Sequence, residues 1–311
     1  MSFYKKVGVV GAGVYGTALA QRFSTRVSEV VILSKSQEVV NDINATNTNR
    51  LLGDVLLNKN ISCVLDYDSM KDCDVIFVVV PSRSALDVCS LLKQHQICAP
   101  VILCSKGVDV ENARLISDGI EEILDNEVAI FSGPSFAYEV ATGLPFGVSI
   151  ASKNIRLATE ISENLAQYPF FIKPISDYVG LQIVGAFKNI LAIGCGITSG
   201  LRLGCSAVSQ LIVNGIEEMI NLSTSMGGKK DTFWEIGGIG DIMLTCTNDK
   251  SRNFMFGKHI ANGGNIQNWS GHLVEGAFTA KAIPLFEEKY QVSMKILYAI
   301  YERIYPVNRE L

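Results

Sequence analysis

V-G-V-V-G-A-G-V-Y-G, at residues 7–16, is the stretch that decides the fold of this 311-residue chain. An apolar strand-like run is followed at once by G-x-G-x-x-G and a helical pattern, and the second apolar run, Val30–Leu33, completes a β-α-β unit. In this context Gly11 permits the tight turn, Gly13 lets the backbone approach a pyrophosphate, and Gly16 lets helix and strand pack closely. The stretch therefore predicts a dinucleotide-binding loop, in preference to a glycine turn without a ligand.

The rest of the pattern divides the chain into two parts. Further buried strands are predicted at residues 75–80, 101–104, 128–131 and 147–151, with helices at 84–95 and 113–124. From residue 179 the pattern changes to long helical stretches, at 179–197, 207–226 and 278–305. We predict an α/β fold, with an N-terminal Rossmann-type, doubly wound, mainly parallel sheet at residues 1–176 and a C-terminal all-helical domain at residues 177–311.

Composition excludes several classes of protein. With 48% hydrophobic and 19% charged residues the chain is too apolar for a disordered protein, and the net charge of −4 argues against nucleic acid or anionic lipid as a partner. The eight cysteines form no C-x-x-C pair and the three histidines form no H-E-x-x-H motif, so no metal site is predicted. No uninterrupted apolar stretch reaches membrane-spanning length, and we expect a cytoplasmic protein with reduced thiols and no membrane span.

The end of the second strand bears on cofactor preference. Sites for NAD usually carry an acid there for the ribose 2′-hydroxyl, whereas this chain has Ser34-Lys35-Ser36. Lys35 could attract a 2′-phosphate, which favours NADP(H), although a merely solvated lysine fits equally well.

Polar residues also follow later strands at the carboxyl edge, where α/β sheets bind ligands. Pro81-Ser82 follows one predicted strand, and Ser105-Lys106 follows another. Lys106 could face a ligand there or be a solvated strand-end lysine. Gly133-Pro134-Ser135 is typical of a turn into a helix, where Ser135 would more often cap the helix than bind a ligand.

The second half contains three unusual polar segments. Lys188 and Asn189 lie in an otherwise apolar helical run at 184–193, and burial would bring the pKa of Lys188 toward neutrality, as a general acid and base requires. Locally, a snorkelling lysine or a structural ion pair is the more usual explanation. Asp241 follows a glycine-rich turn and could complement a helix dipole. Ser251-Arg252-Asn253 could clamp a phosphate through the guanidinium, or simply form a polar loop.

In their order, these motifs resemble NAD(P)-dependent glycerol-3-phosphate dehydrogenase of the bacterial type. The resemblance spans nearly the whole chain and is far more specific than any one motif. It is carried by G-A-G-x-Y-G-T-A-L-A at 11–20, V-P-S at 80–82, S-K-G-V at 105–108, S-G-P-S-F-A-x-E-V-A at 132–141, G-A-F-K-N-I-L-A-I at 185–193, G-I-G-D-I-M-L-T-C at 238–246, S-R-N-x-x-F-G at 251–257 and V-E-G at 274–276.

The resemblance implies roles for individual residues. Lys188 matches the catalytic lysine of the family, with Asp241 positioned to assist it. The predicted substrate-binding residues are Lys106, Gly133, Ser135, Lys188, Asp241, Ser251, Arg252 and Asn253. The glycine loop, the second strand end and the resemblance together predict a cofactor site of Gly11, Gly13, Val14, Tyr15, Gly16, Lys35, Lys106, Ala137, Arg252, Val274 and Glu275.

The implied reaction is the reversible NAD(P)H-dependent reduction of dihydroxyacetone phosphate to sn-glycerol 3-phosphate, for glycerophospholipid synthesis. The resemblance also implies a homodimer. Two alternatives remain: another β-hydroxyacid-type dehydrogenase, and a non-catalytic dinucleotide-binding sensor. The chain departs from the family at Val14, often serine, at 204–207, where G-C-S-A replaces G-D-N-A, and at 292–295, where V-S-M-K replaces a Met-Pro-Ile type run.

Overall fold

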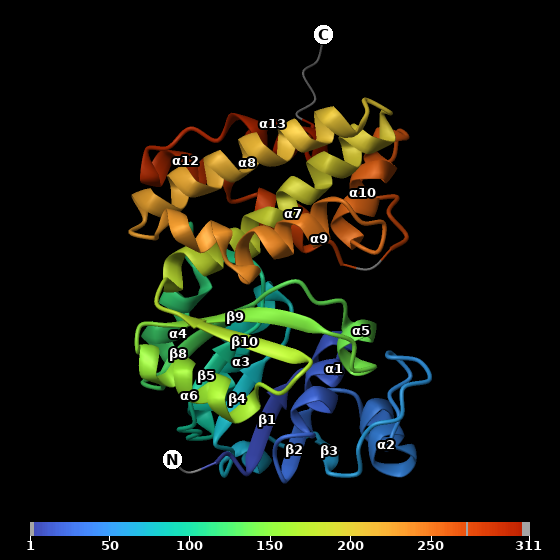
Figure 1. Ribbon diagram of the computed structural model, residues 1–311, viewed down its shortest axis with the longest axis vertical. Helices are drawn as coiled ribbons and strands as arrows, with labels where there is room; N and C mark the ends of the chain where they lie inside the picture. Colours follow the sequence, from blue (N-terminus) through green and yellow to red (C-terminus); the bar gives the residue numbers. More distant parts are fainter. Residues whose placement is uncertain (1–2, 272, 307–311) are drawn as a thin grey trace. The chain divides into compact units, whose positions relative to one another are not determined.

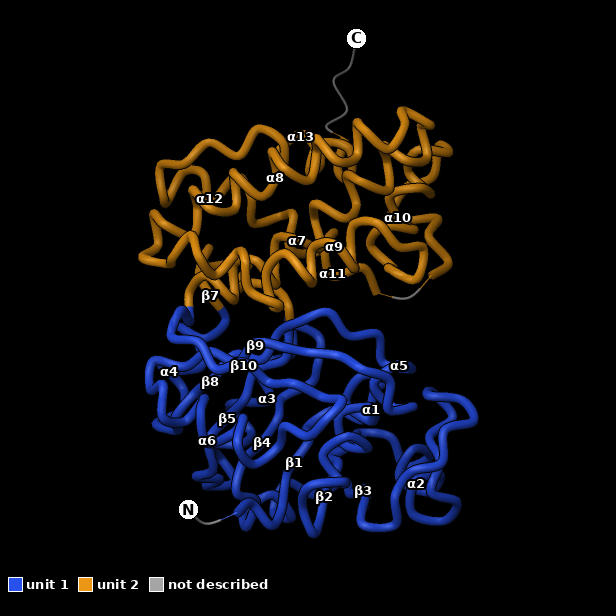
Figure 2. Tube along the Cα trace, viewed as in Figure 1, with its two compact units in different colours: residues 1–105, 116–178 blue, residues 106–115, 179–311 orange. Residues whose placement is uncertain are grey.

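The computed structural model describes residues 3–271 and 273–306 and divides into two compact units (Figures 1 and 2). The first unit comprises residues 1–105 and 116–178, and the second comprises residues 106–115 and 179–311. The short segment 106–115 therefore belongs with the second unit, although along the chain it lies inside the first.

An eight-stranded sheet forms the centre of the first unit, in the order β10-β9-β8-β5-β4-β1-β2-β3. Every neighbouring pair is parallel except β8 with β9, so the predicted mainly parallel sheet is confirmed. The order reverses at β1, whose carboxyl end is therefore the point where such sheets bind ligands. The strands are β1 (Lys6–Val10), β2 (Glu29–Leu33), β3 (Ile61–Val64), β4 (Val75–Val78), β5 (Val101–Leu103), β8 (Val128–Ser132), β9 (Phe146–Ser152) and β10 (Phe170–Ile175).

Helices cover both faces of this sheet. On one face, alternate strand residues such as Val9 and Phe77 form a core with Phe23 of α1 and Leu157 of α6. The buried residues of α3 and α4 lie outside that core, and these two helices pack against each other. The strands are continuously apolar because both of their faces are buried. The helices of this unit are α1 (Val14–Phe23), α2 (Gln37–Thr46), α3 (Ala85–Gln94), α4 (Ile116–Ile123), α5 (Ala137–Ala141) and α6 (Ile155–Leu165).

Some elements near this sheet differ from the prediction. The helix expected from residue 113 begins at Ile116, because Arg114–Leu115 (β7) pairs with Val108–Asp109 (β6) in a small hairpin. The strands β3 and β10 were not predicted. Strand β10 contains Pro174, which is tolerated because β10 is the edge strand and its free side needs no donor.

The second unit is built around α7 (Tyr178–Gly200). This helix is long and apolar enough to cross a membrane, but 94% of its most apolar window is buried inside the protein, as expected for the core helix of a globular unit. Glycines allow other helices to approach it closely. A Cβ atom on Gly257 of α10 would lie 2.0 Å from the carbonyl oxygen of Ile193, and one on Gly276 of α11 would lie 2.4 Å from that of Asn189.

The remaining helices correct one prediction and confirm another. The long helix expected at 278–305 is wrong: Pro284 lies in the first turn of a new helix, and Gln291, with φ 52°, ends that helix. In the described part of the chain after residue 178 no strand occurs, which confirms the all-helical C-terminal region. Its helices are α8 (Cys205–Ser225), α9 (Asp241–Cys246), α10 (Arg252–Ala261), α11 (Glu275–Ala280), α12 (Ile283–Tyr290) and α13 (Lys295–Ile304).

Candidate active site

The three glycines of the G-x-G-x-x-G motif, which runs from the end of β1 into the first turn of α1, have distinct surroundings. Gly11 has φ +117°, and a Cβ there would lie 2.4 Å from the carbonyl oxygen of Val79. A Cβ on Gly16 would lie 1.9 Å from the carbonyl oxygen of Gly11, so this position needs glycine for close packing. Gly13 is exposed, and a Cβ there would meet no atom within 4 Å. The loop therefore presents an open backbone at Gly13, as the approach of a pyrophosphate requires.

The first turn of α1 also suits an anion. Its N-cap, Gly13, supplies no side-chain cap, and no acidic residue lies in the first turn. Val14, where the family often has serine, is exposed at the start of the helix. Backbone N–H groups at a helix N-terminus favour a phosphate. The residues present thus fit the dinucleotide that the sequence predicts.

Ser135 contacts the glycine-loop helix instead of capping its own. The N-cap of α5 is Phe136, without a side-chain cap bond, so the expected capping role of Ser135 is wrong. The Ser135 hydroxyl lies 2.9 Å from the hydroxyl of Tyr15 and 3.1 Å from the carbonyl oxygen of Gly133. A predicted substrate position and a predicted cofactor position are therefore hydrogen-bonded within the first unit.

The other predicted residues of the first unit are more dispersed. Ala137 begins α5, which packs against α1. Gly133 lies so close to β9 that no side chain fits, since a Cβ there would lie 2.6 Å from the Cα of Val148. Lys35 is exposed at the end of β2, just before Ser36, which caps α2.

Lys188 is the centre of a buried charged cluster in the second unit. It is 3% exposed, and its Nζ donates to Oδ1 of Asp241 at 2.7 Å and to the hydroxyl of Thr245 at 2.6 Å. The Lys106 Nζ donates to the other carboxylate oxygen, Oδ2, of Asp241 at 2.7 Å. Asp241 is itself only 1% exposed. One carboxylate is therefore shared by two ammonium groups.

The environment of this cluster shifts the pKa values in ways that suit proton transfer. Burial lowers the pKa of Lys188, the carboxylate of Asp241 opposes this, and the ammonium of Lys106 adds to it, so that the net pKa is about 8. Burial alone would raise the pKa of Asp241, but the two ammonium groups outweigh it and hold that pKa at about 2. At neutral pH Asp241 is therefore ionised, while Lys188 can both donate and accept a proton.

Ser251, Arg252 and Asn253 lie at the start of α10 with different surroundings. The Ser251 hydroxyl caps the helix by accepting from the backbone N–H of Phe254 at 3.3 Å. The Asn253 amide donates to Oδ1 of Asn189 at 3.0 Å, and its oxygen accepts from the backbone N–H of Gly276 at 3.0 Å. Arg252 is exposed.

Asn253 thereby ties the start of α10 to the start of α11. Val274 is the N-cap of α11, and Glu275 is its first residue. The bond from Gly276 to Asn253 places these two predicted cofactor residues beside the segment that carries Arg252.

Thr245 and Asn189 contact predicted site residues and were not themselves predicted. Thr245 lies one turn after Asp241 on α9 and accepts the hydrogen bond from Lys188. The four-residue spacing from Asp241 places both on one helix face and could have revealed it. Asn189 adjoins Lys188 and orients Asn253. Its place in an apolar helical run marks it as unusual, but no local signal reveals a partner so far away in sequence.

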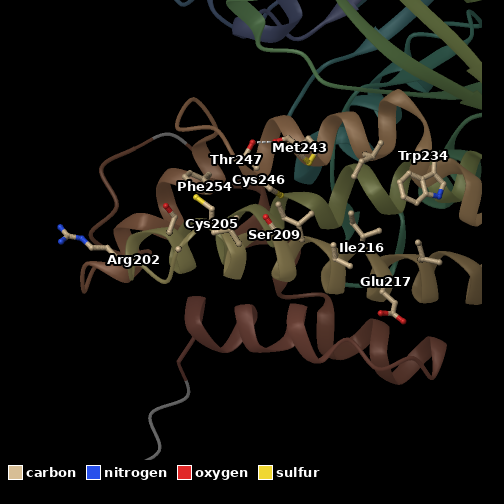
Figure 3. A pocket seen from close by; sticks show the side chains of 17 residues that line it. Arg202, Cys205, Ser209, Ile216, Glu217, Trp234, Met243, Cys246, Thr247 and Phe254 are labelled. Carbon is tan, nitrogen blue, oxygen red and sulfur yellow. Dashed lines mark hydrogen bonds between the residues drawn. The ribbon is translucent and has the colours of Figure 1, made fainter.

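A separate apolar groove of about 940 Å³ runs along α8 (Figure 3). Its lining includes Ile216, Met243 and Trp234, and it contains none of the predicted site residues. Trp234 is 76% exposed. Cys205, one of the positions that departs from the family, lines this groove.

Known proteins resemble the chain along most of its length. Sequence profiles described as the N-terminus and C-terminus of NAD-dependent glycerol-3-phosphate dehydrogenase match residues 6–158 and 177–308. A protein of Novosphingobium aromaticivorans named glycerol-3-phosphate dehydrogenase (NAD(P)+) is 37% identical over 95% of this chain and 90% of its own length. A protein of Sphingopyxis alaskensis named glycerol-3-phosphate dehydrogenase (NAD(P)+) 1 is 36% identical over 95% of this chain and 91% of its own length.

The fold agrees with the sequence matches. The crystal structure of glycerol-3-phosphate dehydrogenase from Coxiella burnetii has a TM-score of 0.91 and 30% identity, covering 98% of this chain and 95% of that one. These matches, together with the glycine loop and the buried lysine, place the chain in one family. The chain belongs to the NAD-dependent glycerol-3-phosphate dehydrogenase family.

Proposed function

We propose that the protein catalyses the reversible reduction of dihydroxyacetone phosphate to sn-glycerol 3-phosphate with NAD(P)H, for glycerophospholipid synthesis. The observation that carries this proposal is the buried Lys188, hydrogen-bonded to the ionised Asp241 in a chain of this family. The names of the relatives, glycerol-3-phosphate dehydrogenase, support the reaction and the nicotinamide cofactor. The substrate is a phosphorylated triose.

In this mechanism Lys188 carries the proton. When bound, the nicotinamide supplies the hydride, which turns the carbonyl oxygen of the substrate into an alkoxide. The Nζ of Lys188 donates a proton to that oxygen during reduction and removes it during oxidation. Asp241 and Thr245 hold the Nζ in place through bonds of 2.7 and 2.6 Å. The lowered pKa of about 8 lets both directions operate near neutral pH.

The phosphate of the substrate is assigned to the start of α10. The Arg252 guanidinium can form two parallel charge-assisted hydrogen bonds with a phosphate. Ser251 and Asn253 flank it, and the N-terminus of the ten-residue helix adds a favourable dipole. Binding energy from the phosphate would orient the carbonyl for reaction. In the same way, Gly11, Gly13 and Gly16 are assigned to the cofactor.

The test is an assay of dihydroxyacetone-phosphate-dependent oxidation of NADPH and NADH, run beside dihydroxyacetone without phosphate. We expect turnover that requires the phosphate. Turnover with a hydroxyacid or ketoacid instead would indicate another dehydrogenase of similar fold. Cofactor binding without any turnover would indicate a sensor.

Removing the charge of Lys106 should change the pH dependence of the reaction. Reduction needs protonated Lys188, so kcat/KM should fall as the pH rises through about 8. The Lys106 ammonium lowers the pKa of Lys188, so Lys106→Met should move this falling limb to higher pH. Asp241 raises that pKa, so Asp241→Asn should move the limb to lower pH. Shifts of both variants in the same direction, measured in pH profiles of kcat/KM, would contradict this coupling.

We further propose NADPH as the preferred cofactor, because Lys35 occupies the end of β2 where an acid would favour NAD. Lys35→Ala should weaken NADPH binding by roughly fivefold, the effect of losing about 1 kcal/mol of exposed charge pairing, and leave NADH binding unchanged. The exposed Lys59 of the same unit provides a matched control, Lys59→Ala. Titration with each cofactor gives the ratio of the Kd for NADPH to the Kd for NADH. A ratio for Lys35→Ala equal to that of the wild type would refute the role of Lys35.

We also propose a homodimer, which the family resemblance implies. The exposed Val213 of α8, with the half-buried Ile216 and Ile220 beside it along the apolar groove, gives the second unit a surface that a second copy could bury. Sedimentation equilibrium should give twice the chain mass, and Val213→Asp should shift the protein toward monomer. A wild-type protein that is monomeric at assay concentration would rule the dimer out.

A further inference from the structure

Asn49 makes an unusual set of buried hydrogen bonds to the glycine loop. It is fully buried in the segment between α2 and β3, and its Nδ2 donates to the carbonyl oxygen of Ala12 at 3.1 Å and to the hydroxyl of Thr17 at 2.7 Å. Its Oδ1 accepts from the backbone N–H of Leu51 at 3.0 Å. The Thr17 hydroxyl in turn donates to the Ala12 carbonyl at 3.4 Å. Two buried side chains therefore hold one carbonyl of the loop.

The direction of that carbonyl determines where the next N–H points. In a planar trans peptide the carbonyl oxygen and the following N–H point in opposite directions. Because the Ala12 carbonyl is bonded to buried groups, the N–H of Gly13 points away from them. Gly13 is exposed and has open space where a Cβ would lie. The same bond that anchors Ala12 thus presents the Gly13 N–H to a ligand.

Such an anchor matters more at a glycine than elsewhere. Glycine adopts positive and negative φ about equally readily, so the Ala12–Gly13 peptide is easier to rotate than one between two larger residues. A rotated peptide would turn a carbonyl oxygen toward the anion and repel it. The glycine that permits close approach therefore also leaves the peptide free to point the wrong way unless something holds it.

We infer that Asn49 is a positioning residue for cofactor binding, which holds the Gly13 N–H toward the pyrophosphate through the Ala12 carbonyl. This inference rests on the proposed function for the identity of the ligand. Thr17 acts on the same carbonyl and shares the role. Asn49 acts on the cofactor only through the loop backbone, so its effect is specific to phosphate binding.

The test measures nucleotide binding as well as turnover. Asn49→Ala should raise the Kd for NADH about tenfold, the effect of one weakened hydrogen bond to a charged group. In competition experiments the affinity for ADP should fall by the same factor as that for NADH. The affinity for adenosine, which lacks phosphate, should not change. The KM for NADH should rise in parallel, with kcat at saturating NADH within about twofold of the wild-type value.

Asn164→Ala provides a matched control in the same unit. Asn164 is also buried, donates to a backbone carbonyl, that of Glu160, and accepts from the backbone N–H of Tyr4, but has no bond to the glycine loop. It should lose stability without losing NADH affinity. If Asn49→Ala does not fold, Thr17→Val replaces it, with Thr17→Ser, which keeps the hydroxyl, as its control.

Two results would overturn the inference. One is an NADH affinity for Asn49→Ala that matches that of Asn164→Ala, and the other is an equal loss of affinity for adenosine and ADP. Failure of the proposed reaction is distinguishable from both. A wild-type protein that binds NADH but does not reduce dihydroxyacetone phosphate would refute that reaction, while the binding comparison would still decide the role of Asn49.

Discussion

Replacing Lys188 with methionine should lower kcat for dihydroxyacetone phosphate reduction by about 10²–10⁴-fold, the usual contribution of a positioned general acid. Methionine fills most of the volume of the lysine but carries no proton. Asp241 keeps its 2.7 Å bond to Lys106, so no unpaired carboxylate is left buried and the variant should fold. Lys188 is not among the predicted cofactor-binding residues, so the Kd for NADH should not change.

The control separates loss of the proton donor from loss of structure. Lys153→Met removes an exposed lysine whose ammonium bonds Glu121 in the first unit, and it should leave kcat unchanged. Thermal unfolding and NADH titration of both variants check that they fold and bind cofactor. A Lys188→Met enzyme with a rate within tenfold of the wild type would remove the proposed role of Lys188 in proton transfer.

The glycine loop was predictable because its evidence is local. The strand, the turn and the helix start are contiguous in the sequence. The sequence also shows what each glycine is needed for: the tight turn, the approach of the pyrophosphate, or the packing of helix on strand. The structure adds steric detail, such as the 1.9 Å approach at Gly16. The anchor of that loop was not predictable, since Asn49 contacts Ala12 across 37 positions and lies in a segment with no motif.

The lysine cluster shows why the order of motifs carried more information than any local pattern. On local grounds a snorkelling lysine or a structural ion pair was a more usual explanation of Lys188 than catalysis. A solvated strand end explained Lys106 as well as a ligand did. Their shared partner, Asp241, lies 53 and 135 positions away from them. A hydrophobic period of about two to four residues cannot relate residues so far apart in the sequence. Only the family resemblance connected the three residues.

The errors have local causes. The local sequence alone favoured Ser135 as the cap of α5, although the resemblance assigned it to the substrate. The helix begins later, and the hydroxyl bonds Tyr15 and Gly133 instead. The apolar period at 278–305 continues across two interruptions because all three short helices bury one face. Hydrophobic periodicity shows which helix face is buried but not whether the helix is continuous. The ends of the separate helices are marked instead by Pro284 and by the left-handed Gln291.

Replacing Arg252 with alanine should raise the KM for dihydroxyacetone phosphate by roughly 100-fold, because hydrogen bonds to charged groups contribute about 1.5–3 kcal/mol each. The guanidinium is exposed, and the cap of α10 comes from Ser251, so the helix should keep its start. Arg252→Lys keeps the charge but not the planar fork, and should recover only part of the affinity. Steady-state kinetics with varied substrate measure both effects.

Dihydroxyacetone, the substrate without a phosphate, shows whether the weaker substrate binding of Arg252→Ala is caused by a lost contact with the phosphate. Dihydroxyacetone has no phosphate for Arg252 to bind, so its kcat/KM should be nearly the same in the wild type and in Arg252→Ala. The ratio of kcat/KM for the two substrates should therefore collapse in the variant, even if Arg252 also contributes to cofactor binding, because a cofactor defect lowers both values together. If the ratio stayed at its wild-type value, the phosphate would have to be bound elsewhere, and the start of α10 would lose its assigned role.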